Sequence, residues 1–245
     1  MAAGVRLDRL LVERGLAPTR ERAQRLIMAG VVLVDDRPLT KSGTTVAASA
    51  VIRLREMPAP YVSRGGEKLA GALDAFGVAV QGRIGLDVGA STGGFTDCLL
   101  RRGAASVVAV DVGYGQLAWS LRQDARVTVV ERVNARHLTV ADVGVIPELV
   151  TMDVSFISAT LVLPSIASLL APVGDVIVLV KPQFEVGRDQ VGKGGIVRDD
   201  ALRASAVDRV RAAAMTLGLA PRAQADSVLP GPGGNREIFL WLSRG

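Results

Sequence analysis

From residue 60 onward the chain alternates between short apolar runs and segments with helical spacing. The strongest runs, rich in Val, Leu and Ile, occupy residues 84–88, 107–111, 149–153 and 176–181, and a weaker one lies at 127–130. Strands that are apolar at nearly every position are buried on both faces of a sheet, and the helices that connect them cover those faces. The alternation therefore predicts an α/β fold with a Rossmann-like, doubly wound and mostly parallel sheet.

Further elements complete this predicted domain. Helices are expected at 68–76 and 200–217, and two late strands at 225–228 and 237–242. In open sheets of this kind, ligands bind at the carboxyl ends of the strands, beside the point where the strand order reverses. Residues at those strand ends are therefore the first candidates for a functional site.

The first sixty residues follow another pattern. Apolar residues at helical spacing predict a helix over residues 6–13 and a second one between its N-cap, Thr19, and Gly30. Strand-like runs follow at 31–34 and 51–54. We therefore expect a small α+β domain ahead of the sheet.

Two prolines mark the boundary between these domains. Pro58 and Pro60 break secondary structure and favour a stiff, extended segment. We predict a first domain over residues 1–57, a linker over 58–62 and a second domain over 63–245.

Charge is distributed unevenly between the two parts. Residues 1–60 contain ten Lys or Arg and six Asp or Glu, a net charge of +4, whereas residues 61–245 contain nineteen and eighteen, a net charge of +1. A small basic segment is typical of a domain that binds a polyanion, which in the cytosol is most often nucleic acid. The charge alone also fits an arginine-rich surface that only faces solvent.

The cysteine and histidine content excludes several chemistries. With one cysteine, Cys98, and one histidine, His137, the chain forms no internal disulfide and no metal site of several cysteines or histidines. We expect Cys98 to be a small buried thiol and His137 to be a surface or loop residue. Arg, Asp or Pro interrupts every long apolar run and no signal-peptide pattern opens the chain, which favours a cytoplasmic protein without a membrane span.

A glycine-rich turn follows the first strand of the second domain. Residues 87–95 read DVGASTGGF, and glycine lets backbone N–H groups approach a ligand closely before a helix begins. The spacing is neither the G-x-G-x-x-G of dinucleotide sites nor that of a phosphate loop for nucleoside triphosphates. Asp111 ends the next strand, where a carboxylate can accept both hydroxyl hydrogen bonds of an adenosine ribose. The alternative is a turn whose glycines serve helix–strand packing only.

Four ionisable residues are expected to meet at one edge of the sheet. Lys68 lies on the helix before the first strand, Asp153 and Lys181 end two later strands, and Glu237 opens the last one. A lysine that ends an apolar strand is costly to bury without a partner. Each of the four, taken alone, is more often a surface charge or part of a structural ion pair.

The N-terminal segment resembles a known RNA-binding fold. The run RLDRLLVERGLAPTRERAQRLIMAGVVLVDDRPLTKSGTTV is similar to the alpha-L domain, first seen in a ribosomal small-subunit protein and shared with pseudouridine synthases. In that family two helices and the following turn contact structured RNA. A small structural domain without RNA is the alternative. The phosphate contacts that the resemblance implies are Arg6, Arg9, Arg20, Arg22, Arg25 and Lys41.

The glycine turn resembles the cofactor loop of S-adenosylmethionine-dependent methyltransferases. Its pattern is D-x-G-x-x-x-G-G, and the position of Asp111 strengthens the similarity. The resemblance implies S-adenosylmethionine as the cofactor of a methyltransferase domain. The cofactor contacts that it implies are Asp87, Gly89, Ala90, Ser91, Thr92, Gly93, Gly94, Phe95 and Asp111.

The four ionisable residues resemble the K-D-K-E tetrad of ribose 2′-O-methyltransferases related to the heat-shock enzyme FtsJ. A ribose hydroxyl is a poor nucleophile whose proton must leave as the methyl group transfers, so a lysine that is kept neutral can serve as base. Desolvation and a second ammonium favour the neutral form, whereas neighbouring carboxylates favour the charged form. The resemblance implies that Lys181 is the base and that Lys68, Asp153 and Glu237 position it.

The order of the motifs is typical of one family. An alpha-L domain, a proline-containing linker, SRGGEKL at 63–69, the glycine turn, KPQFE at 181–185 and GGNRE at 233–237 resemble the TlyA family. The resemblance implies 2′-O-methylation of cytidines in ribosomal RNA, with ribosomal RNA or ribosomal subunits as partners and Arg64 as a further RNA contact. Residues 59–61, Ala-Pro-Tyr, depart from the basic and aromatic residues that the family often has there, which bears on how the linker couples the domains.

Two other functions are left open by the sequence. TlyA relatives are often named haemolysins, so membrane lysis is one alternative, although no basic amphipathic helix stands apart from the two domains. The other is a non-catalytic assembly factor that binds ribosomal RNA, which the intact tetrad disfavours. The oligomeric state is left open.

Overall fold

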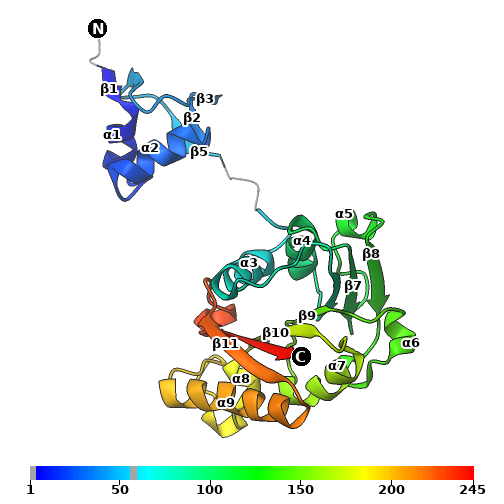
Figure 1. Ribbon diagram of the computed structural model, residues 1–245. Coiled ribbons are helices and arrows are strands. Elements are labelled where there is room, and N and C mark those ends of the chain that lie inside the picture. The colour runs from blue at the N-terminus through cyan, green and yellow to red at the C-terminus, as the bar shows by residue number, and fades with distance from the viewer. Residues whose placement is uncertain (1–3, 56–59) are drawn as a thin grey trace. The chain divides into compact units, whose positions relative to one another are not determined.

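The computed structural model describes residues 4–55 and 60–245, and the chain divides into two compact units over Met1–Pro58 and Ala59–Gly245. Figure 1 shows the elements of both units. Residues 58 and 59 of the predicted linker lie outside the described residues. Each unit has a hydrophobic core of its own.

The first unit packs two helices on short antiparallel strands. Its elements are β1 (Gly4–Arg6), α1 (Leu7–Glu13), α2 (Arg20–Met28), β2 (Val32–Val34), β3 (Arg37–Pro38), β4 (Thr45–Ala47) and β5 (Ile52–Leu54). Strand β2 pairs with β3 and β5, while β1 and β4, which the sequence did not predict, pair with each other. Thr19 is confirmed as the N-cap of α2, because its Oγ1 accepts a 3.2 Å hydrogen bond from the Arg22 N–H. Leu7, Leu11 and Ile27 are fully buried in a core that the helices share with the strands.

The second unit is built on a mixed sheet. Its strands are β6 (Ile84–Val88), β7 (Ser106–Asp111), β8 (Val127–Glu131), β9 (Leu149–Met152), β10 (Gly174–Val180), β11 (Ala220–Asp226) and β12 (Ile238–Arg244). Within residues 60–245 the strand order is β11-β12-β10-β9-β6-β7-β8. Strand β12 runs antiparallel between β10 and β11, and the remaining pairs are parallel. The direction of winding reverses between β6 and β9, which confirms the predicted doubly wound fold.

Helices cover both faces of this sheet. The face toward α3 (Arg64–Phe76) and α4 (Gly94–Arg101) is packed separately from the face toward α7 (Leu163–Leu169) and α9 (Asp200–Thr216). Side chains of β7 alternate between the two cores, since Val107 and Ala109 join the first and Val108 and Val110 join the second. Short helices lie in three connections: α5 (Trp119–Arg122), α6 (Val140–Val143) and α8 (Pro182–Glu185).

The two late strands differ from the prediction. Strand β11 begins at Ala220 instead of residue 225, and β12 continues to Arg244. Residues of β11 alternate between exposed and half-buried, and its sequence APRAQAD lacks the β-branched and aromatic residues that favour strands. Pairing with β12, not local propensity, therefore forms this strand.

Ile166 of α7 is fully buried against the sheet, so Ile166→Ala should lower the free energy of unfolding of the second unit by about 2–5 kcal/mol. Both tryptophans of the chain, Trp119 and Trp241, belong to this unit, so urea unfolding of the full chain followed by tryptophan fluorescence reports on it. Met215→Ala, at an exposed position of α9, should change the unfolding midpoint little. Equal midpoints for the two variants would contradict the place of α7 in the core.

Candidate active site

Four charged side chains line one cavity at the carboxyl edge of the parallel strands. Lys68 comes from α3, Asp153 follows β9, Lys181 follows β10 and Glu237 precedes β12. Because β12 runs antiparallel to β10, its first residues lie at the edge at which β10 ends. The cavity has a volume of about 400 Å³, and the glycine turn forms part of its wall. The structure thus brings together the four residues that the sequence singled out.

The four charges form two ion pairs. Lys68 Nζ lies 2.5 Å from Glu237 Oε2, and both side chains are almost completely buried. Lys181 Nζ lies 2.6 Å from Asp153 Oδ1 and donates a 2.7 Å hydrogen bond to Ser155 Oγ. The other carboxylate oxygen of Glu237, Oε1, is buried without a hydrogen-bond partner. Buried charges and an unpaired acceptor cost stability, which indicates a role beyond holding the fold.

The glycine turn lies against the end of β9. Gly89 has a φ of 85°, and a Cβ at this position would lie 2.5 Å from the carbonyl oxygen of Asp153. Gly93 does not line the cavity, and a Cβ there would overlap Leu117 and Leu121, so its lack of a side chain serves packing; its contact with a cofactor stays a prediction. The residues of the turn that do line the cavity are Gly89, Ala90, Ser91, Thr92, Gly94 and Phe95.

Asp87 lies beneath the turn and not at its surface. Its fully buried carboxylate accepts hydrogen bonds from Thr96 Oγ1 of α4 at 2.7 Å and from Thr151 Oγ1 of β9 at 3.1 Å. Burial raises the pKa of Asp87 to about 7. Asp87 thus joins the helix that follows the turn to the neighbouring strand, and a direct contact between Asp87 and a cofactor stays a prediction.

A second cavity, of about 550 Å³, adjoins the first along Gly89, Ser91 and Asp153. Asp111, at the end of β7, lies on its wall. Its Oδ2 accepts a 2.8 Å hydrogen bond from the Ser91 N–H, and its Oδ1 accepts one of 2.7 Å from the Gly113 N–H. Each oxygen retains acceptor capacity for a further donor such as a ribose hydroxyl.

Sequence reasoning missed other residues on the wall of the second cavity. Val112 follows β7, and Asn134 and Ala135 come shortly after β8. The sequence could have indicated Asn134, because it follows β8 at the same edge of the sheet at which Asp111 ends β7.

A third cavity, of about 360 Å³, shares Lys181 and Pro232 with the first. Phe156 and Phe184 line it with their ring centroids 5.3 Å apart, and Phe156 is 92% exposed. Phe156 also has a φ of 64°, a conformation that L-residues other than Asn and Asp rarely adopt. This exposed ring in a strained backbone is a further candidate that sequence reasoning missed.

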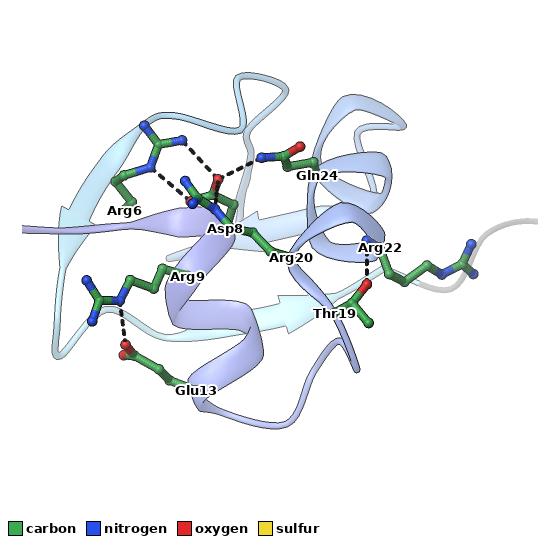
Figure 2. Close-up of polar contacts among 8 residues, drawn as sticks. All are labelled: Arg6, Asp8, Arg9, Glu13, Thr19, Arg20, Arg22 and Gln24. Atoms are coloured by element: carbon green, nitrogen blue, oxygen red, sulfur yellow. Dashed lines mark hydrogen bonds and ion pairs between the residues drawn. The ribbon is translucent and has the colours of Figure 1, made fainter.

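The predicted RNA contacts of the first unit fall into separate groups (Figure 2). Arg6 and Arg20 both bind the carboxylate of Asp8, whereas Arg9 pairs with the glutamate one turn further along α1. The side chain of Arg22 points away from these contacts. The six predicted contacts in this unit, all of which are exposed, are Arg6, Arg9, Arg20, Arg22, Arg25 and Lys41.

Arg64 is the predicted RNA contact in the second unit. It is exposed, lines the first cavity and donates a 3.3 Å hydrogen bond to the carbonyl oxygen of Pro230. Arg64 thereby joins the start of α3 to the loop that leads to Glu237.

Cys98 and His137 lie as predicted. Cys98 is fully buried in α4, where burial raises the pKa of its thiol to about 11, and His137 is exposed. Within residues 4–55 and 60–245 no three His, Cys, Asp or Glu side chains are placed to hold a metal ion. In the same described ranges no helix has the length and apolar character needed to cross a membrane.

Comparison with known proteins identifies the family. Residues 61–244 match the FtsJ-like methyltransferase family, and residues 5–52 match the S4 domain. The 16S/23S rRNA (cytidine-2′-O)-methyltransferase TlyA of Mycobacterium tuberculosis is 53% identical over 243 residues, which are 99% of this chain and 91% of that protein. This chain belongs to the TlyA family.

Solved structures share the fold of this chain. A protein of Streptococcus thermophilus described as a hemolysin is 41% identical with a TM-score of 0.74, covering 100% of this chain and 90% of that one. Magnesium protoporphyrin IX methyltransferase from Synechocystis, solved with bound S-adenosylmethionine, shares the fold at 15% identity with a TM-score of 0.52, covering 78% of this chain and 86% of that one. An S4 domain followed by an FtsJ-like methyltransferase domain confirms the predicted TlyA resemblance.

Gly89→Ala should abolish measurable affinity for S-adenosylmethionine, because the new Cβ would press on the Asp153 carbonyl and displace the wall between two cavities. Gly82→Ala is the matched control, since Gly82 also has a positive φ, of 76°, but has open space around it and lines neither cavity. Isothermal titration calorimetry on variants with the wild-type circular dichroism spectrum measures the difference. Equal affinities would show that the turn is not part of a cofactor site.

Proposed function

We propose that this TlyA-family protein transfers a methyl group from S-adenosylmethionine to the 2′-hydroxyl of cytidines in ribosomal RNA in the cytoplasm. The observation that carries the proposal is the convergence of two lysines and two carboxylates on a cavity that shares its glycine wall with a second cavity. Family membership supports it, because the M. tuberculosis relative is named for methylation of cytidine 2′-hydroxyls in 16S and 23S rRNA.

The second cavity suits the adenosine part of the cofactor. Asp111 has acceptor capacity for ribose hydroxyls, and Val112 and Ala135 provide apolar walls for a base. When bound, the cofactor supplies a methyl group carried on a positively charged sulfur. Gly89 and Ser91 line both cavities and would hold the cofactor where the cavities meet.

Lys181 is the base in this proposal. Its Nζ is held by Asp153 and Ser155, and the residue lines both the first and the third cavity. A ribose that enters from the third cavity would therefore reach the amine beside the methyl donor. Lys68 brings a second positive charge to the first cavity, and Glu237 holds Lys68 in place.

The third cavity suits the target nucleotide. Proteins that act on single nucleotides in RNA stack unpaired bases on aromatic side chains, and Phe156 and Phe184 present such a pair of rings. A cytosine stacked on Phe156 would have its ribose near the Lys181 side of the same cavity. The S4 domain supplies further RNA contacts through the exposed basic residues of the first unit.

Lys181→Ala should lower the single-turnover rate of methylation by about 10²- to 10⁴-fold while rRNA and cofactor affinities persist. Lys181→Arg should fail comparably, because a guanidinium keeps its proton at neutral pH. Incorporation of labelled methyl groups gives the rates, and mass spectrometry of the rRNA locates the product.

Lys193→Ala is the control for these variants, since Lys193 is exposed and lines neither the first nor the third cavity. It should keep the wild-type rate at saturating rRNA. A fast Lys181→Arg variant would show that position 181 supplies only charge. A wild-type protein that binds rRNA and cofactor without methylating it would instead be a non-catalytic assembly factor.

Phe156→Ala should weaken binding of the target nucleotide roughly 5- to 150-fold, because stacking of a base on an aromatic ring contributes about 1–3 kcal/mol. Phe156→Trp should retain most of the affinity. Val173→Ala, which truncates an exposed apolar residue at the other end of β10, is the control and should change nothing. The KM for rRNA measures the effect, and an unchanged KM for Phe156→Ala would remove the third cavity from the substrate site.

A further inference from the structure

Asp8 occupies an unusual place for an acidic residue in a basic domain. Among residues 4–55 it is the one charged residue that is buried, with its side chain 0% exposed. Two of the predicted RNA contacts, Arg6 and Arg20, surround it and are themselves about half exposed, at 48% and 55%. A buried carboxylate therefore lies directly beneath two surface guanidinium groups.

Hydrogen bonds occupy both oxygens of this carboxylate (Figure 2). Arg6 binds it side-on, donating from Nε to Oδ1 at 3.1 Å and from Nη2 to Oδ2 at 2.9 Å. Oδ2 also accepts from Arg20 Nε at 3.0 Å and from Gln24 Nε2 at 3.0 Å. Asp8 thus ties β1 and α1 to α2 and fixes the direction of both arginines.

Both arginines keep donors that Asp8 does not use. Arg6 retains Nη1, and Arg20, which binds through Nε, retains both terminal nitrogens. The loop that carries Lys41 borders the same place, because a Cβ on Gly43 would lie 3.5 Å from Arg6 Nη1. The free donors of the two arginines therefore belong to one preformed group.

The charge of this group matches one phosphate. Two guanidinium groups and one carboxylate leave a net charge of +1, and a phosphodiester carries −1 with acceptor oxygens that suit the planar donors of arginine. The hydrogen bonds from Arg6 hold the pKa of Asp8 well below its usual range, so the carboxylate stays charged in any ordinary binding experiment.

We propose that Asp8 is a positioning residue that joins Arg6 and Arg20 into a single binding site for a backbone phosphate of RNA. The inference rests on the proposed function, because it takes RNA as the ligand. Free arginine side chains lose rotamer freedom when they bind, which lowers affinity. Asp8 restricts both side chains before RNA arrives.

Whether Asp8→Asn binds RNA more tightly or more weakly than the wild type distinguishes positioning of the arginines from the effect of charge alone. Removing a negative charge from an RNA-binding face strengthens attraction to phosphates, so electrostatics alone gives tighter binding for Asp8→Asn. Positioning gives weaker binding, because an asparagine cannot accept all of these hydrogen bonds and its amide group repels the arginine donors.

The test is binding of the full-length protein to deproteinised rRNA from cells that lack it, measured by filter binding across a salt series. Asp8→Asn should weaken binding about tenfold and make the slope of log affinity against log salt shallower by about one, since one phosphate contact is lost. Glu13→Gln is the matched control: it also removes a carboxylate paired with an arginine on α1, but this pair, Arg9 with Glu13, is exposed. It should bind as tightly as the wild type or more tightly.

A mutant cycle excludes a general loss of structure. In the background Arg6→Ala with Arg20→Ala, the change Asp8→Asn should weaken binding no further, because Asp8 acts through these two residues. If nitrogen–proton NMR spectra of the full chain show that Asp8→Asn does not fold, the RNA affinities of Arg6→Lys and Arg20→Lys test the proposal instead. Each keeps the charge but loses the planar contact with Asp8, and each should bind more weakly than the wild type.

Three outcomes overturn the proposal. They are Asp8→Asn binding at least as tightly as the wild type, a further loss in the double-alanine background, and lysine variants with wild-type affinity. If the wild type itself fails to bind rRNA, the proposed function fails along with this inference. S-adenosylmethionine affinity, measured in parallel, should be the same in all of these variants.

Discussion

The candidate site depends on how two parallel strands are aligned. Val88 of β6 pairs with Met152 of β9, so the next residues, Gly89 and Asp153, leave the sheet side by side. Because glycine has no Cβ, the turn can lie directly on the Asp153 carbonyl. A shift of one residue in this register would turn Asp153 to the other face of the sheet. The same alignment makes one short turn a wall of two cavities, one suited to the methyl donor and one to its acceptor.

Because β12 is antiparallel, its first residues, and not its last, lie at the edge of the sheet that carries the site. Strand β10 ends at the same edge, so Glu237 lies near Lys181, and Glu237 forms an ion pair with Lys68 of α3. A buried pair of this kind is weak evidence for stability, because desolvation offsets most of the attraction, and loss of one partner leaves a buried charge uncompensated. The aliphatic cores on both faces of the sheet supply the stability that this site does not.

The sequence predicted those parts of the molecule in which local pattern and tertiary structure agree. Apolar runs in the sequence predicted the central strands. Lys181, Asp153 and Asp111 became candidate site residues because each ends a predicted strand, and parallel strands end at the same edge of a sheet. Strand β11 was misplaced because its polar sequence becomes a strand only through pairing with β12. Phe156 was missed because its importance lies in its exposure and backbone conformation, which no local pattern encodes.

Acidic residues were the other weak point of sequence reasoning. Asp87, a cofactor contact by resemblance, is fully buried below the turn, where it binds Thr96 just after the turn and Thr151 of β9, a strand far along the chain. Asp8 was passed over because helical spacing shows which residues of α1 face the core but not that a buried carboxylate there binds Arg6 of β1 and Arg20 of α2. Both carboxylates are buried and are held by partners that only the fold brings to them.

The polar character of β11 has a consequence for how the protein behaves at high concentration. An edge strand offers unpaired backbone groups on which a strand of another chain can add, and long flat apolar edges aggregate in this way. In β11, Pro221 lacks an N–H donor, the register is irregular between Pro221 and Ala223, and Arg222 lies exposed beside them. These features make this edge a poor template for a strand of another molecule. The polar sequence that hid β11 from strand prediction therefore also disfavours aggregation through this edge.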